Sequence, residues 1–406
     1  MKHLISIFIF FTIGICTAWA QPATKSITIE ISNPLAKARA NEPVVIPLHD
    51  VGFPVAACIV KDGAAEIPSQ LDDLNQDDIP DELAFVVDVP AKGKKSIRIQ
   101  LLQQGEQAKY TPRVYAHMKI NDKNKRYPRV TMVNAYGDNV ERGTYDMIEG
   151  HGVSFESEIN AFRIYFDNRQ SIDLYGKVHQ QLELAETDFH TTNYNDKGYG
   201  SDVLWAGKAI GLGSFRGFAN NQATTIDTVA YRSQAILANG PVRTIIEVGD
   251  KGWQYQGATL NMKQRYILYA AHRDVEVQVS FNKPLQQLSF CTGAQMLETD
   301  NEGFVNDSGL CGSWGSNIPT KTDSLCRPEI IGLGVCVPYK YVKNAFNDGQ
   351  NYLITMGNYE GTSLSYHFTF CARKEQKGFV SSKEWFHFLE NWQEQLKTPC
   401  TIHIKK

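Results

Sequence analysis

The sequence predicts a mainly β fold, in which a small N-terminal β-sandwich precedes a large β-sandwich with one C-terminal helix. Short runs in which hydrophobic and polar residues alternate recur along the chain, and Gly, Pro, Asn or Asp separate them. This is the pattern of half-buried strands. The chain has 406 residues, which is more than one hydrophobic core normally serves, so we expect two domains.

The small sandwich is predicted over residues 21–105. Ile27, Ile29 and Ile31 alternate with polar neighbours at its start. Similar strand-like runs follow at 44–48, 55–60, 83–89 and 96–101. Several short strands so close together indicate a small β-sandwich. Residues 103–112 are polar and lack the pattern, so we place the boundary there and expect the second domain over residues 112–406.

The second domain is predicted to be a larger two-sheet sandwich, because long β-rich segments usually fold that way. Its strand-like runs lie at 160–166, 171–174, 244–248, 265–270, 275–281 and 363–370. One helix is expected near the C-terminus. Ser381 can cap it with Glu384 three residues on, and Pro399 ends it. The apolar stripe of this helix consists of Trp385, Leu389, Trp392 and Leu396.

Residues 1–20 are predicted to be a cleaved signal peptide. A basic start precedes an apolar run over 4–15, and cleavage is expected near Ala20/Gln21. The run is shorter than the roughly 20 residues of a membrane-spanning helix, so we expect a soluble periplasmic or secreted protein without a membrane span. Cys16 would allow a lipoprotein signal, but Ile15 stands where such signals normally have a small residue.

Composition narrows the possible partners. With a net charge of -3 the chain has no overall positive potential to attract polyanions, so nucleic acid and anionic membrane surfaces are not expected as partners. No GxSxG, HExxH or GxxxxGK[ST] motif occurs, and the glycine run at 211–217 is not a dinucleotide fingerprint, so no nucleotide cofactor is expected.

Among the cysteines, the cluster Cys311, Cys326 and Cys336 is the expected place for a disulfide. Nothing in the sequence indicates an oligomeric state.

An acidic loop at residues 72–82 is a candidate calcium site. The predicted ligands are the side chains of Asp73, Asn75, Asp77 and Asp81 and the carbonyl of Ile79. Alternate oxygen ligands in a curled loop suit a hard cation. The loop resembles the Dx[DN]xDGxxD loops of calcium-binding β-repeats and dockerins, although Asp78 stands where they have Gly. Calcium here would be structural, and a solvated acidic turn is the alternative.

Residues 136–217 concentrate His, Tyr, Arg and carboxylates in loop-like segments, which is where sites on a β scaffold usually lie. The predicted catalytic residues are His190, Tyr194, Arg216, His151, Tyr145, Arg142 and His272. The predicted substrate-binding residues are Trp205, Tyr199 and Asp188. His190 is the preferred candidate for the catalytic base, because Asp188, two residues away, could orient its ring.

Three functions can use these residues. Cleavage of a uronic-acid polymer by β-elimination needs a base, an acid and a cation for the carboxylate, which His190 or His151, Tyr194 or Tyr145, and Arg142 or Arg216 can supply. Glycoside hydrolysis needs a carboxylate pair. The candidates for that pair are Glu149, Glu156, Glu158, Asp188 and Asp202. Sugar binding without catalysis needs only rings such as Trp205 and Tyr199.

The segments GYGSDVLWAG, GSFRG, NGPVRTIIEV and QRYILYAAHRDVEV resemble an uncharacterised family of secreted Bacteroidetes proteins associated with polysaccharide degradation. The phrase GPVRTIIEV, with the R-x-x-L-Y strand after it, is also similar to the sheet core of galactose-mutarotase-like supersandwich folds. These resemblances imply a supersandwich-like second domain and a carbohydrate partner. They imply no particular reaction. On residue chemistry alone, β-elimination on an acidic oligosaccharide or polysaccharide is our first hypothesis, and a glycoside hydrolase or a glycan-binding protein is the alternative.

Overall fold

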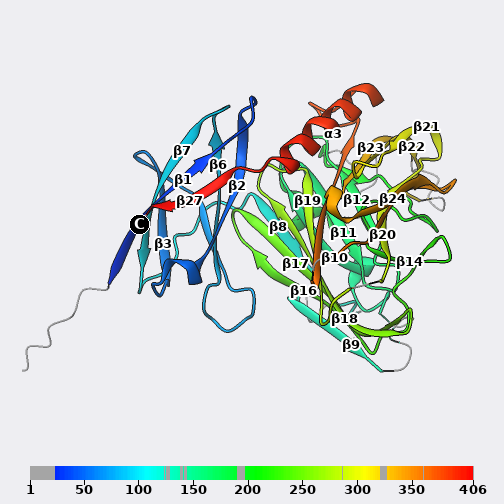
Figure 1. Cartoon of the computed structure of the whole chain (residues 1–406), viewed down its shortest axis with the longest axis horizontal. Helices are drawn as coiled ribbons and strands as arrows, with labels where there is room; N and C mark the ends of the chain where they lie inside the picture. Colours follow the sequence, from blue (N-terminus) through cyan, green and yellow to red (C-terminus); the bar gives the residue numbers. More distant parts are fainter. Residues whose placement is uncertain are drawn as a thin grey trace, which may run out of the picture.

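The computed structural model describes residues 23–122, 124, 129–137, 140, 144–189, 197–285, 287–320, 327–359 and 361–405. The predicted fold class is confirmed, because the described chain consists mainly of antiparallel sheets with one long helix near its C-terminus (Figure 1). The predicted signal peptide lies outside the described residues. None of the helices in the described part of the chain has the length and hydrophobicity needed to cross a membrane.

The first sandwich lies to one side of the molecule (Figure 1). One of its sheets has the order β27-β1-β7-β3-β4 and the other β2-β6-β5. Their bounds are β27 (Thr401–Lys405), β1 (Thr24–Ser32), β7 (Lys94–Leu102), β3 (Ala57–Asp62), β4 (Ala65–Ile67), β2 (Arg39–Pro47), β6 (Glu82–Val89) and β5 (Ser69–Asp72). Ile29, Ile31 and Phe85 are fully buried between the two sheets, so the alternation seen in the sequence marks the faces that pack together.

The last strand of the chain belongs to this first sandwich. β27 pairs antiparallel with β1, and Lys405 stands opposite Thr28. The sequence prediction had assigned these residues to the larger domain. Alternation over five residues cannot reveal a partner strand that lies almost the whole chain away, because register depends on tertiary contacts.

A nine-stranded antiparallel sheet forms the largest layer of the remaining chain, with the order β21-β22-β23-β26-β19-β18-β17-β16-β9. The bounds are β21 (Thr299–Val305), β22 (Leu310–Asn317), β23 (Glu329–Cys336), β26 (Ser363–Ala372), β19 (Asp274–Phe281), β18 (Ala258–Tyr269), β17 (Arg243–Tyr255), β16 (Tyr231–Asn239) and β9 (Met132–Tyr136).

Two five-stranded sheets pack against this layer, with the orders β13-β12-β11-β10-β8 and β15-β14-β20-β25-β24. Their bounds are β13 (Ser201–Asp202), β12 (Ile172–Gly176), β11 (Asn160–Tyr165), β10 (Gly152–Ser157), β8 (Val114–His117), β15 (Gln222–Thr224), β14 (Arg216–Ala219), β20 (Phe290–Gln295), β25 (Asn351–Met356) and β24 (Val342–Asn347). Phe162 of β11 meets Phe368 of β26 edge-on, with ring centroids 5.4 Å apart. Phe290 of β20 stacks on Phe281 of β19 at 5.2 Å. Both small sheets therefore share one aromatic core with the large sheet.

The predicted C-terminal helix is confirmed as α3 (Ser382–Lys397). Ser381 caps it by accepting a hydrogen bond from the Glu384 backbone N–H. Trp385 is buried, and its Nε1 donates to the Leu333 carbonyl of β23 at 3.0 Å. The stripe thus fixes α3 on the outer face of the large sheet. The shorter helical turns are η1 (Leu48–Val51), η2 (Glu149–His151), α2 (Leu184–Thr187) and η3 (Tyr339–Tyr341).

The cysteines depart from the sequence prediction. Cys311 and Cys336 are both free thiols, and Cys326 lies outside the described residues. Cys311 faces the main core, whereas Cys336 lies under α3. Because neighbouring strands place these two side chains on opposite faces of the sheet, they cannot pair with each other.

Buried ionic contacts join the first sandwich to the large one. Arg243, at the start of β17, donates to Asp72 at 2.7 Å and to Glu82 at 2.5 Å. His272 lies against the Asn41 carbonyl, with Nε2 2.9 Å from that oxygen. The two sandwiches therefore meet through specific polar contacts as well as through packing.

Candidate functional site

One face of the sheet formed by β8 and β10–β13 is polar. Alternate side chains of a strand point to opposite faces, so Phe162 and Ile164 of β11 enter the core while Arg163 and Tyr165 face away. Strand pairing aligns a cross-strand row on that second face. The row consists of His117, Ser154, Arg163 and Asp173. This polar face is the scaffold of the candidate site.

Arg163 is the fixed centre of the polar face. Its guanidinium pairs with Asp173 and lies 4.4 Å from the centroid of the Phe189 ring. Burial disfavours the guanidinium, but Asp173 outweighs that effect and raises the pKa of Arg163 above its ordinary value. Tyr165 donates its hydroxyl hydrogen to the same carboxylate at 2.6 Å. Burial, together with repulsion from Asp173, raises the pKa of Asp202 well above the ordinary range.

Tyr145 and His151 form a stacked pair at one end of this face. Their ring centroids are 3.9 Å apart with an interplanar angle of 10°. His151 Nδ1 lies 3.0 Å from the Tyr145 carbonyl oxygen, which can only accept a hydrogen. In the neutral ring Nδ1 is therefore the protonated nitrogen, and Nε2 carries the lone pair. His151 is thus set up to accept a proton at Nε2.

Unusual backbone conformation positions this histidine. Gly150 and His151 both have positive φ, at 71° and 70°. A positive φ is uncommon for a residue with a side chain and is often found at functional sites. The His151 carbonyl accepts a hydrogen bond from the Phe166 N–H at 2.8 Å, so the turn is tied to the end of β11.

Arg169 lies beside the stacked pair, in the loop between β11 and β12. Its guanidinium carbon is 5.7 Å from the Tyr145 ring centroid and 5.6 Å from that of Tyr165. Asp167 holds Arg169 through bonds of 2.8 and 2.7 Å, and 39% of the arginine side chain is exposed. Burial raises the pKa of Tyr145 in spite of the nearby cation. The tyrosine is therefore a neutral hydroxyl near pH 7.

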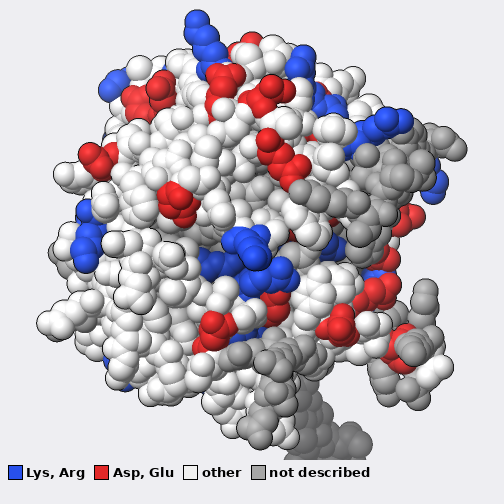
Figure 2. Space-filling model, turned by 90° about the vertical axis from the view of Figure 1, so that its right-hand side faces the viewer, with Lys and Arg blue, Asp and Glu red and all other residues white. Residues whose placement is uncertain are grey.

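Arg169 also lines a cavity of about 600 Å³. Lys208, Arg216, Thr224 and Asp348 are among the residues that line it. The side of the molecule that carries β14 and β24 in Figure 1 faces the viewer in Figure 2, where Lys and Arg side chains gather near the centre. Asp and Glu lie around them in separate groups. The side of the molecule that carries β14 is thus basic near its centre.

Trp205 lies next to a residue that lines this cavity. Its side chain is 45% exposed, and Gly207, which lines the cavity, lies against the indole. A Cβ on Gly207 would come within 3.0 Å of Trp205 Nε1. The backbone N–H of Trp205 donates to Asn317 at 2.7 Å, which anchors an exposed ring in a defined position.

Among the sequence-predicted residues, Tyr145 and His151 stack on each other, Arg216 lines the cavity that Arg169 also borders, and Trp205 lies against Gly207 of that cavity. Arg142, His190 and Tyr194 lie outside the described residues. Other predicted residues lie elsewhere on the polar face or away from it.

Asp188 caps α2 at the β8 side of the polar face, where Lys119 Nζ lies 2.5 Å from its carboxylate. Tyr199 lies near the β13 edge, 5.8 Å from Lys197 Nζ. His272 does not join this region. It bonds to Asp274 at 3.1 Å and to the first sandwich, because β19 begins at the interface between the two sandwiches.

Sequence reasoning missed Arg163, Tyr165, Arg169 and His117. Arg163 and Tyr165 occupy alternate positions of β11, and this period-2 pattern could have identified these two, whereas Arg169 lies in the loop after the strand. His117 Nε2 lies 3.3 Å from Asp188. Burial, only partly offset by Asp188, lowers the pKa of His117 to about 4, so this ring is neutral near pH 7.

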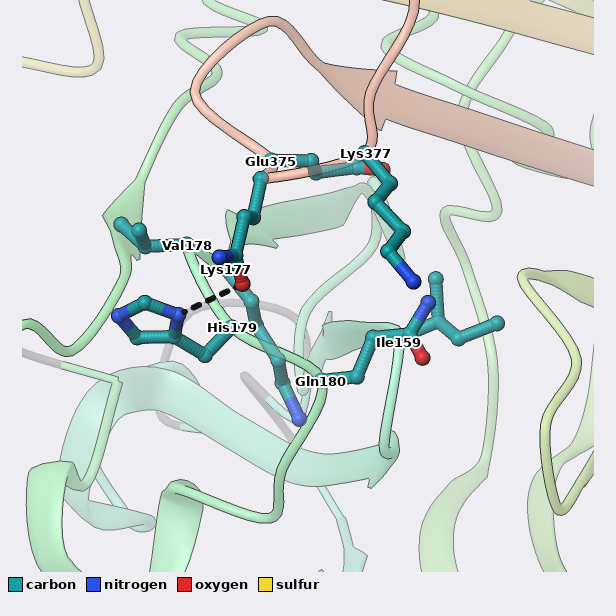
Figure 3. A pocket seen from close by; sticks show the side chains of 8 residues that line it. Ile159, Lys177, Val178, His179, Gln180, Glu375 and Lys377 are labelled. Atoms are coloured by element: carbon teal, nitrogen blue, oxygen red, sulfur yellow. Dashed lines mark hydrogen bonds between the residues drawn. The ribbon is translucent and has the colours of Figure 1, made fainter.

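A second cavity, of about 250 Å³, lies between residues 177–180 and the turn after β26 (Figure 3). His179 Nδ1 is 3.3 Å from Gln376 Oε1 across it. Lys177 already donates to Glu156 and to two carbonyls. Since Glu375 is paired with Arg273, these charged groups are engaged within the protein.

The acidic loop is held by its own backbone. Asp73 accepts hydrogen bonds from the N–H groups of residues 75–78, and Asp81 accepts one from Leu74 at 2.7 Å. Within the described ranges, no three His, Cys, Asp or Glu side chains are grouped so that they could hold a metal ion. The calcium site stays a prediction.

The fold and the polar face define a large β-sandwich protein with a Tyr–His pair and a basic cavity on one side. The chain belongs to the family described as Domain of unknown function (DUF4861), which it matches over residues 31–402. It is 22% identical to Uncharacterized protein P7 of Formosa agariphila over the whole of both chains.

Two solved structures from Enterococcus faecalis are among those to which this chain is similar, a glycosyl hydrolase family 38 protein and an alpha-mannosidase. Each has a TM-score of 0.48 and 10% identity and matches 94% of this chain. The match covers 47% and 46% of those chains, so this chain spans about half of their length.

Proposed function

We propose that this protein is a carbohydrate-active enzyme that cleaves an acidic oligosaccharide or polysaccharide by β-elimination. The observation that carries the proposal is the stacked pair of Tyr145 and His151, in which His151 Nε2 is the basic nitrogen and Arg169 lies alongside. A base, an acid and a cation next to one another are what elimination beside a carboxylate requires. With the predicted signal peptide, we expect the reaction to take place outside the cytoplasm.

The roles follow from the chemistry of each group. His151 Nε2 removes the proton from the sugar carbon that bears the carboxylate, and Arg169 stabilises the negative charge that develops on that carboxylate. The bond from the neighbouring carbon to the glycosidic oxygen then breaks, and its electron pair leaves with the oxygen. A carbon–carbon double bond forms in the ring, and the Tyr145 hydroxyl gives its proton to the leaving oxygen. The exposed ring of Trp205 can stack on an adjacent sugar.

A glycoside hydrolase is the second candidate, and one observation favours it. Burial and repulsion from Asp173 raise the pKa of Asp202, which suits a carboxyl group that donates a proton as a general acid. Other carboxylates predicted for this role are engaged, since Glu156 pairs with Lys177 and Glu158 with Arg113. The hydrolase therefore depends on Asp202, whereas the lyase depends on His151 and Tyr145.

Incubation with uronic-acid glycans separates the candidates. A lyase produces an unsaturated sugar that absorbs in the ultraviolet, and His151→Gln and Tyr145→Phe should each reduce kcat by roughly 10²–10⁴-fold. His387→Gln on the exposed side of α3 and Tyr110→Phe, which removes a hydrogen bond to Glu66 of the first sandwich, are matched controls that should retain activity. New reducing ends without absorbance, lost in Asp202→Asn, would establish the hydrolase. Binding without turnover that is lost in Trp205→Ala would establish a glycan-binding protein.

A further inference from the structure

One of the residues that line the 600 Å³ cavity is a buried arginine that is not held in an ion pair. Arg216 belongs to β14 and is 4% exposed. Its Nη2 donates to Ser171 Oγ at 3.1 Å, whereas Nη1 is buried without a hydrogen-bond partner. Among the described residues, no carboxylate forms an ion pair with it.

Such an arrangement is unusual, because buried charges are normally paired. Burial lowers the pKa of Arg216 to about 10, so the side chain is still a cation near pH 7. Proteins keep a costly group of this kind mainly where it serves a function. An anion bound in the cavity would supply the missing partner.

The other polar groups of the cavity also favour an anion. Lys208 is exposed at its rim, and the hydroxyl of Thr224 is buried without a partner. Asp348 also lines the cavity, but its carboxylate accepts hydrogen bonds from the backbone N–H groups of Gln350 and Asn351 at 2.8 and 2.7 Å. The positive groups of the cavity therefore outnumber the negative ones.

We propose that this cavity binds a second anionic group of the glycan, carried by the sugar unit next to the one that lies at His151. Arg169 borders both the Tyr145–His151 pair and the cavity, so one chain of sugars can extend from the pair into the cavity. The anion is a group with several acceptor oxygens, either a uronate carboxylate or a sulfate ester. The identity of the ligand as a glycan rests on the proposed function, whereas the binding of an anion rests on Arg216 and its surroundings.

Titration calorimetry on the full chain carrying His151→Gln tests this proposal. The probes are a disaccharide with two uronic acids, its methyl ester, and a neutral disaccharide with one sulfate ester. We expect one of the charged probes to bind more tightly than the methyl ester. Arg216→Gln should weaken that binding roughly tenfold to a hundredfold, as loss of a charge-assisted hydrogen bond does, and should leave the methyl ester unaffected.

Further variants keep the test decisive if Arg216→Gln fails to fold. Lys208→Ala changes an exposed side chain and should also weaken binding of the charged probe, as should Thr224→Val. Arg265→Gln is the matched control, because Arg265 pairs with Glu247 on the large sheet, and it should bind like the parent. Whichever charged probe loses affinity identifies the source of the anion.

Equal affinity for charged and esterified probes, or affinity unchanged in both Arg216→Gln and Lys208→Ala, would overturn the proposal. Failure of the two proposals can be told apart. Binding that depends on Arg216 without cleavage by the parent chain would refute the elimination reaction and leave the anion site standing. Efficient cleavage by Arg216→Gln with unchanged affinity would refute the anion site and leave the elimination reaction standing.

Discussion

Replacing Arg243 should weaken the connection between the two sandwiches more than any exposed substitution. Its side chain is 2% exposed and contacts Asp72, which is 3% exposed, and Glu82, which is 27% exposed. In Arg243→Met the apolar stem is largely kept, but the Asp72 carboxylate stays buried without its cation. Because the Glu82 side chain can turn towards water, Asp72 is the one carboxylate that remains buried without a cation in this variant.

Breaking a buried pair by removing one partner costs about 3–5 kcal/mol, which is the loss we expect in the free energy of unfolding. Gln70 Nε2, which lies 2.6 Å from Asp72, compensates part of the charge and favours the lower end of that range. Asp72→Asn in the same chain should recover part of the loss, because the stranded carboxylate becomes neutral.

Urea denaturation followed by tryptophan fluorescence measures this effect, and the transition that reports separation of the first sandwich is the one to compare. Arg265→Met is the control. Arg265 also reaches the first sandwich, at the Leu74 carbonyl, but its side chain is 28% exposed, so we expect a loss of under about 1 kcal/mol. If Arg243→Met loses no more than this control, the buried pair is not what holds the two sandwiches together.

Three further predictions concern stability. Burial lowers the pKa of His272, but the bond to Asp274 and other contacts raise it above its ordinary value. Protonated His272 therefore stabilises the folded state. This contribution to the free energy of unfolding is complete below about pH 6.5 and is lost as pH rises through the pKa of His272 in the folded protein. Thermal melts should show that loss, and a His272→Gln variant with the same pH dependence would contradict it. Leu389→Ala on α3 should cost about 2–5 kcal/mol in urea unfolding, and a loss below about 1 kcal/mol would mean that the helix is not packed as described. Calcium should raise the Tm of the parent chain but not of Asp73→Ala if the acidic loop binds it, and equal Tm values with calcium and with chelator would exclude that site.

The strands and the long helix could be predicted because their signals are local. Ile27, Ile29 and Ile31 alternate with polar residues, and Trp385 and Leu389 share one face of a helix. The spacing of apolar residues along the chain is therefore enough to show which side chains are buried. Strand partners and sheet order depend on contacts between distant residues, and no local pattern contains them. For the same reason His272 could be recognised as a polar residue in a strand but not as part of the interface with the first sandwich.

The candidate site could be predicted in part. Tyr145 and His151 were selected because loops on β scaffolds carry function, and the structure stacks them. Arg163 and Arg169 were overlooked because they lie in and just after a strand-like run, where side chains were assumed to pack. The unpaired state of Arg216 is a property of its surroundings in three dimensions, so no sequence pattern could reveal it.

The pairing of β27 with β1 has a consequence for how the chain is made. During synthesis β1 emerges first, but the edge that β27 covers stays open until residues 401–405 have been added. An open edge can pair with another chain, so premature release or loss of these residues should favour aggregation. The same pairing places Lys405 opposite Thr28, close to the start of the described chain.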